Sequence, residues 1–141
     1  KMRRLQGVRK VLLLEEAWKA IAKEGMASYV RYLFKTVRKY FGEAIVVTQE
    51  VEDIISSPIV KESIINNADC KILLDQRKYR NKFDQIQTLL GLTDKERAQV
   101  LSINLSNDPA RRYKEVFISL GGVQSAVYAT EVSDEEYLVR P

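Results

Sequence analysis

The stretch Val11-Leu12-Leu13-Leu14-Glu15-Glu16-Ala17-Trp18 places four apolar residues directly before two adjacent glutamates. An apolar run of this length without polar alternation is typical of a strand that is buried on both faces of a parallel sheet. In α/β proteins, functional groups gather at the carboxyl ends of such strands. Two neighbouring carboxylates at a buried edge are costly unless a cation or strong donors accompany them. The stretch therefore predicts a buried strand over 11–14 with a metal or charged ligand at its acidic end.

The acidic pair has two interpretations. In the first, residues 11–16 form the Walker B strand of a nucleotide-driven motor. In the second, Glu15 and Glu16 open the next helix, where negative charge is favoured by the positive end of the helix dipole. On these eight residues alone the two interpretations are equally open.

Length and composition limit the class of protein. With 141 residues, 45% of them hydrophobic and 30% charged, the chain suits a single globular domain over 1–141. It has no histidine and one cysteine, Cys70, which excludes a disulfide framework, the usual zinc sites and a Ser/His/Asp triad. We expect Cys70 to be a small buried apolar residue. The net charge of +4 permits contact with nucleic acid or an anionic membrane without requiring either.

No run approaches the length of a membrane span and no secretory signal is present, so we expect a cytoplasmic protein. Because the first residue is Lys1 rather than Met, we expect a fragment of a longer chain. Residues 1–10 form a basic lead-in that precedes an α/β part over 11–104.

A long helix is predicted from Ser28, its N-cap, to Gly42, its C-cap. One face is apolar, with Val30, Leu33, Phe34, Val37 and Phe41. Another face is basic; solvated surface charge is the simpler explanation of it, but it is also the best candidate surface for nucleic acid or a partner. Its residues are Arg31, Lys35, Arg38 and Lys39.

Two further strands end in polar residues. The strand predicted over 44–48 ends in Thr48-Gln49, and the strand over 71–74 is followed by Asp75, Gln76, Arg77 and Arg80. Helical crossovers between successive strands imply a parallel sheet, so all three strands deliver polar groups to one edge. In phosphoryl transfer one acid holds Mg²⁺, a second polarises the attacking water, an amide orients that water and an arginine neutralises charge. This convergence favours a nucleotide site.

The rest of the chain gives local signals. A helix is predicted from Ser57-Pro58 to residue 67, another is closed by Gly91, and Thr93-x-x-Glu96 is a capping box. Alternation over 113–120 and 123–130 around Gly121-Gly122 predicts an antiparallel hairpin. A second capping box, Ser133-x-x-Glu136, opens a short final helix.

Four ordered blocks carry a family resemblance: LLLEEAWKAIA, YLFKTVRKYFGEAIVVTQEVEDI, IINNADCKILLDQRKY and YKEVFISLGG. Together, from Val11 to Leu138, they resemble the carboxyl-terminal part of the TraG-type conjugative transposon ATPases, the motor proteins of type IV secretion. The resemblance implies an incomplete RecA-like P-loop NTPase sheet, the Walker B half, with the hairpin at its end. It also implies ATP and Mg²⁺ as cofactors of the parent protein.

The resemblance assigns roles to individual residues. Glu15 and Glu16 match the Walker B acids, with Glu15 on Mg²⁺ through water and Glu16 catalytic. Gln49 matches the sensor glutamine. Arg77 or Arg80 matches the arginine finger, although either is equally suited to pair with Asp75 or Asp84. The family has Asp-Glu where this chain has Glu15-Glu16, which shifts the first carboxylate by one methylene.

The resemblance also implies partners and a location. The parent is expected to be a homo-oligomer, such as a hexamer, that works with type IV secretion components and contacts DNA. It is expected at the cytoplasmic face of the bacterial inner membrane. It would hydrolyse ATP to drive DNA transfer or assembly of the apparatus.

One expected motif is absent. No G-x-x-x-x-G-K-[ST] loop occurs, so we expect the Walker A segment upstream of Lys1 and the fragment alone to be inactive. In RecA-like sheets the Walker A strand lies between the second and third strands found here. We therefore predict that 44–48 pairs directly with 71–74, or that another chain's strand fills the gap.

Two rival functions remain. One is a non-catalytic DNA- or partner-binding module that uses the basic helix face. The other is a metal-dependent nuclease built on Glu15, Glu16 and a third acid such as Asp75. The absence of histidine and the sensor-like Gln49 rank the nuclease last.

Overall fold

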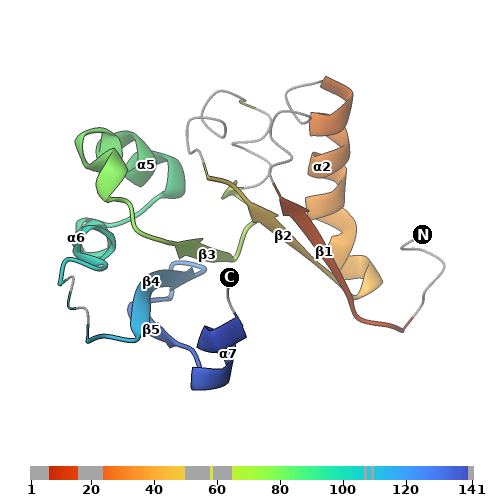
Figure 1. Ribbon diagram of the computed structural model, residues 1–141. Coiled ribbons are helices and arrows are strands. Elements are labelled where there is room, and N and C mark those ends of the chain that lie inside the picture. Colours follow the sequence, from red (N-terminus) through yellow and green to blue (C-terminus); the bar gives the residue numbers. More distant parts are fainter. Residues whose placement is uncertain are drawn as a thin grey trace. The chain divides into compact units, whose positions relative to one another are not determined.

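The computed structural model of the chain describes residues 7–15, 24–49, 58, 65–106, 108 and 110–139 (Figure 1). The chain divides into two compact units, residues 1–68 and residues 69–141. The first contains a parallel strand pair with a helix, and the second contains a three-stranded antiparallel sheet with several short helices. The protein is therefore α/β, with both parallel and antiparallel pairing. The helix predicted over 57–67 lies largely outside the described residues.

The first unit is built on strands β1 (Lys10–Glu15) and β2 (Gly42–Val47), which pair in parallel with Glu15 opposite Val47. Between them in sequence lie α2 (Glu24–Thr36) and the 3-10 helix η2 (Val37–Tyr40). Val30, Leu33 and Val37 are buried and anchor this helical segment. The predicted parallel pairing of the first two strands is thus confirmed.

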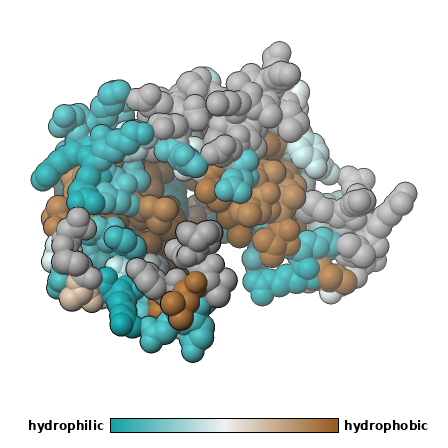
Figure 2. Space-filling view, in the orientation of Figure 1, coloured by the Kyte–Doolittle hydropathy of each residue, from teal (hydrophilic) through white to brown (hydrophobic). Residues whose placement is uncertain are grey.

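One face of the β1–β2 pair is exposed. Val11 and Leu13 retain 59% and 56% of their accessible surface, and Ile45 and Val47 on the same face retain 45% and 41%. Figure 2 shows the apolar side chains gathered over these two strands. The prediction that the first strand is buried on both faces is wrong for this chain, because side chains alternate along a strand and only alternate positions are partly covered.

The end of the long helix differs from the prediction. The helix begins at Glu24, so Ser28 is not its N-cap, and it tightens into η2 before Phe41. Phe41, rather than Gly42, takes the left-handed conformation (φ 53°), and its backbone N–H donates to the Arg38 carbonyl oxygen at 3.2 Å. This turn directs the Phe41 side chain to solvent, so it is not part of the apolar face.

The second unit begins with β3 (Cys70–Leu73), η4 (Arg77–Lys82), α5 (Phe83–Leu90) and α6 (Asp94–Ser102). It continues with β4 (Tyr113–Leu120), β5 (Gln124–Glu131) and α7 (Asp134–Val139). The sheet order is β3-β4-β5, all antiparallel. Its core contains four nearly inaccessible side chains: Phe83, Val100, Ile103 and Phe117.

Several local predictions are confirmed in this unit. Gly91 ends α5 in the left-handed conformation, and Thr93 and Glu96 form a complete capping box. At the hairpin, Gly121 and Gly122 both have positive φ, and the Val123 N–H donates to the Leu120 carbonyl oxygen at 3.0 Å. Two positive φ values are the requirement of a type I′ turn, which glycine meets without strain.

The third strand is placed differently from the prediction. β3 pairs antiparallel with β4, and within the described residues β2 pairs only with β1. The prediction that 71–74 joins a parallel sheet is wrong for its pairing with β4, because the hairpin supplies an antiparallel partner within the same unit. The direct pairing of 44–48 with 71–74, which would join the two units, stays a prediction. Cys70 is exposed rather than buried, since it stands at the first position of this strand. Within the described part of the chain, no helix has the length and apolar character needed to cross a bilayer.

Candidate functional site at the ends of the parallel strands

Glu15 is the last residue of β1 and its side chain is exposed. Its carboxylate forms no hydrogen bond or ion pair with any residue that the structure describes. Glu16 lies outside the described residues. Glu15 is thus a carboxylate at the carboxyl end of a parallel strand that is available to a ligand.

The end of β2 lies beside the end of β1. Since Glu15 is opposite Val47, the residues that follow β2, Thr48 and Gln49, leave the sheet at the same edge. Thr48 is half-buried, Gln49 is exposed, and both form polar contacts in the structure. The parallel register therefore brings the predicted acid and the predicted sensor amide to one edge of one sheet.

A charged pair follows β3. The Asp75 carboxylate accepts hydrogen bonds from the Arg77 guanidinium, with Nη2 at 2.5 Å and Nε at 2.8 Å from Oδ2. Asp75 Oδ1 also accepts from the Arg77 backbone N–H at 3.0 Å. The Arg77 side chain lowers the pKa of Asp75, and Asp75 in turn raises the pKa of Arg77. The alternative in which Arg77 pairs with Asp75 is the one that the structure contains.

Arg80 lies in η4, three residues beyond Arg77, and is exposed. Among the residues that the structure describes, it has no hydrogen-bond or ion-pair partner. Asp84, the other acid considered for it, instead pairs with Arg97 of α6. Arg80 therefore keeps its guanidinium available, whereas Arg77 does not.

The predicted edge divides between the two units. Glu15, Thr48 and Gln49 belong to the parallel pair of the first unit, whereas Asp75, Arg77 and Arg80 follow an antiparallel strand of the second. Each group is built within its own unit. Within the described residues there is no cluster of three acidic or sulfur side chains able to hold a metal ion.

The four cations of the predicted basic surface, Arg31, Lys35, Arg38 and Lys39, are all exposed on α2 and η2. They lie on the side of the helical segment away from buried Val30, Leu33 and Val37. Sequence reasoning did not include two tyrosines of the same helix, Tyr29 and Tyr32, which are also exposed. The helical period could have identified them, because each tyrosine comes directly before a residue of the predicted apolar face, Val30 or Leu33.

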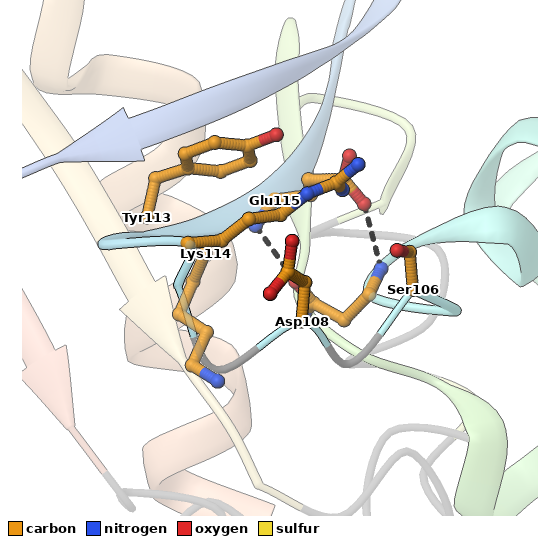
Figure 3. A pocket seen from close by; sticks show the side chains of 7 residues that line it. Ser106, Asp108, Tyr113, Lys114 and Glu115 are labelled. Atoms are coloured by element: carbon orange, nitrogen blue, oxygen red, sulfur yellow. Dashed lines mark hydrogen bonds between the residues drawn. The ribbon is translucent and has the colours of Figure 1, made fainter.

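The sequence analysis also missed a polar hollow in the second unit (Figure 3). Asn104 and Glu115 bracket it reciprocally: the Asn104 N–H donates to Glu115 Oε2 at 2.8 Å and the Glu115 N–H donates to Asn104 Oδ1 at 2.9 Å. Its volume is about 20 Å³, room for one water molecule. Its other lining residues are Ser106, Asp108, Arg111, Tyr113 and Lys114. The hollow is too small for a nucleotide. The two hydrogen bonds between Asn104 and Glu115 close the loop before β4.

Comparison with known proteins identifies relatives. Residues 1–140 match the family model of the TraG P-loop domain. The chain is similar to the type IV secretion system protein CagE of Helicobacter pylori, with 33% identity over 92 residues, 65% of this chain and 9% of CagE. It is also similar to the solved structure of VirB4 of Thermoanaerobacter pseudethanolicus. That match has a TM-score of 0.70 and 25% identity, and covers 96% of this chain and 34% of VirB4. The chain thus spans a minor part of each relative's length.

Proposed function

Since the chain belongs to the TraG P-loop domain family, we propose that it is the Walker B part of an ATP-hydrolysing motor of a type IV secretion apparatus. The observation that carries this proposal is the parallel β1–β2 pair, which places Glu15 and Gln49 at one edge of the sheet. That edge is where α/β proteins bind nucleotides. The similarity to CagE and VirB4 supports the type IV secretion context.

The proposed chemistry is hydrolysis of the terminal phosphoryl bond of ATP by water. Glu16, directly after β1, polarises the attacking water, and Gln49 orients it from the end of β2. Glu15 fits a Mg²⁺ ligand through water, because it is an exposed carboxylate without a partner among the described residues. When bound, Mg²⁺ neutralises charge on the phosphate oxygens.

The proposed arginine finger is Arg80. A finger must reach a developing negative charge with a free guanidinium. The Asp75 carboxylate already engages two nitrogens of the Arg77 side chain. Arg80 has no such partner within the described residues, which supports its assignment as the finger. Arg77, by contrast, stabilises the turn after β3 through its contacts with Asp75.

The remaining parts of the site are proposed to come from the longer protein. A Walker A segment upstream supplies the phosphate-binding loop, and its strand lies between β2 and β3 to complete a RecA-like sheet over a single domain. The exposed apolar face of the β1–β2 pair supports a longer domain in which further elements pack against this face. Without that segment, residues 1–141 bind ATP weakly or not at all and are inactive.

The proposed setting is an oligomer, such as a hexamer, at the cytoplasmic face of the bacterial inner membrane. There the motor works with other components of the secretion apparatus to drive DNA transfer or assembly. Oligomerisation brings an arginine of one protomer to the nucleotide of the next, which is consistent with an exposed Arg80.

The test is Mg²⁺-dependent ATP hydrolysis by the intact protein and by its Glu16→Gln variant. We expect the variant to bind ATP normally and to turn over at least about a hundredfold more slowly, the scale of lost acid–base assistance. The matched control is Glu131→Gln, which removes an exposed carboxylate at the end of β5 and should leave turnover unchanged. An intact protein that neither binds nor hydrolyses ATP would contradict the motor assignment.

A further inference from the structure

The exposed side of α2 and η2 is strongly basic. From Gly25 to Gly42 the chain has four cations and no Asp or Glu. Arg31 and Lys35 lie one helical turn apart, and Arg38 and Lys39 follow in η2. Because buried Val30 and Leu33 fix the opposite side of the helix, these cations are held at the surface.

Three of these four cations lack the ion-pair partners that other basic residues have among the described residues. Within the described residues, Arg31, Lys35 and Lys39 form no ion pair, whereas Arg9, Arg97 and Arg112 pair with Glu43, Asp84 and Asp134. Like charges one turn apart destabilise a helix. The negative end of the helix dipole favours Lys35 in the last turn, but it does not account for Arg31 in the middle of α2. The surface therefore carries positive charge that the fold itself does not need.

Two exposed tyrosines of α2 lie near the cations. Tyr29 and Tyr32 are 56% and 48% exposed, and Tyr32 is an i, i+3 neighbour of both Tyr29 and Lys35. Aromatic rings beside cations are the arrangement that binds single strands, because the rings stack on bases and the cations neutralise phosphates. The bases of a duplex are already stacked on one another, so such a surface can contact a duplex through its phosphates but cannot stack on its bases.

We propose that this face, Tyr29, Arg31, Tyr32, Lys35 and Lys39, binds single-stranded nucleic acid. Arg31, Lys35 and Lys39 contact successive phosphates, and the two tyrosine rings stack on bases. With a rise of about 1.5 Å per residue in α2 and about 2.0 Å in η2, the cations extend over roughly 13 Å of the helix axis, enough for two or three nucleotides. The binding does not depend on ATP hydrolysis, so it goes beyond the proposed motor activity.

The test measures binding of a fluorescent 20-nucleotide oligo-dT to the intact protein without ATP, over a range of salt concentrations. In the Arg31→Gln/Lys35→Gln variant we expect affinity to fall roughly tenfold or more at 0.1 M salt, and the log–log salt slope to fall by about 1.4. The matched control is Lys95→Gln/Arg111→Gln, which removes the same charge from exposed sites on α6 and the loop before β4. The control should retain both affinity and slope.

A second variant separates stacking from charge. Tyr29→Leu/Tyr32→Leu should weaken oligo-dT binding about tenfold with the salt slope unchanged, and should leave binding of a DNA duplex as it was. Circular dichroism verifies that both variants remain folded. Equal losses in the basic variant and its control, or equal affinity for duplex and oligo-dT in every variant, would overturn the proposal. Binding of polyglutamate is measured in the same way. If the basic variant keeps oligo-dT binding and loses only polyglutamate binding, the face binds an acidic protein and the proposal is also overturned.

Discussion

At the scale of single residues, the two arginines after β3 have different surroundings and should behave differently. Arg77 is engaged by Asp75 through its side chain and its backbone, whereas Arg80 has no partner in the described part of the chain. We expect Arg80→Ala to lower ATP turnover in the assembled intact protein by about a thousandfold, the lower range for an arginine finger, with ATP affinity retained.

The comparison variant is Arg77→Ala, which leaves the half-buried Asp75 carboxylate without its main partner. We expect a small loss of stability, about 0–1 kcal/mol, which is the contribution of an exposed ion pair. Turnover should stay within roughly tenfold of the parent, because Arg77 is not the proposed arginine finger. Turnover and nucleotide affinity are measured together with the oligomeric state by light scattering. A large catalytic loss in Arg77→Ala together with a normal Arg80→Ala would reverse the two roles.

At the scale of elements, Glu96 joins α6 to the hairpin. Its carboxylate is buried, and Oε2 accepts from the Thr93 backbone N–H at 2.8 Å while Oε1 accepts from Ser119 Oγ of β4 at 3.3 Å. Hydrogen bonds from the Thr93 backbone and from the Ser125, Thr93 and Ser119 side chains lower the pKa of Glu96, although burial opposes them. One ionised group thus serves both the helix cap and the contact with the sheet.

This geometry predicts how stability depends on pH. Because the folded pKa of Glu96 is depressed, its contribution is fully present above the unfolded value of about 4.5 and is lost as pH falls through the folded pKa. Glu96→Gln should cost about 1–3 kcal/mol at pH 7 and should flatten the decline of stability below pH 4.5. Thermal unfolding of the 1–141 chain between pH 3 and 7 measures both effects, with Glu131→Gln as the exposed control. An unchanged pH profile in Glu96→Gln would show that the buried carboxylate does not control it.

The same elements show what the sequence could predict. Gly91, the capping box at Thr93 and the Gly121-Gly122 turn depend on a few neighbouring residues, so their structure followed from local rules. The common edge of Glu15 and Gln49 also followed, since a helical crossover makes the two strands parallel. The partner of β3 did not follow, because strand pairing is decided by distant residues. The left-handed conformation of Phe41 did not follow from the sequence, because the neighbouring Gly42 adopts that conformation more easily and was the expected C-cap.

At the scale of the whole molecule, the exposed face of the β1–β2 pair distinguishes this chain from the longer protein proposed for it. Leu13 and Ile45 lie opposite each other on that face, each about half exposed. If the remainder of a RecA-like domain covers them, the same substitution should have different effects in the two proteins. Burial of an apolar side chain contributes about 1.5–3 kcal/mol, whereas an exposed one contributes little.

We therefore expect Leu13→Thr/Ile45→Thr to change the stability of the 1–141 chain by less than about 0.5 kcal/mol, because threonine suits strands and both sites face solvent. In the intact protein the same double variant should lower the unfolding temperature by several degrees, since about 2 kcal/mol or more of apolar burial is lost. Leu12→Thr, on the less exposed face of β1, is the control and should destabilise both proteins. If the intact protein tolerates Leu13→Thr/Ile45→Thr as well as the short chain does, this face stays uncovered, and the proposal that the rest of the domain packs against it is wrong.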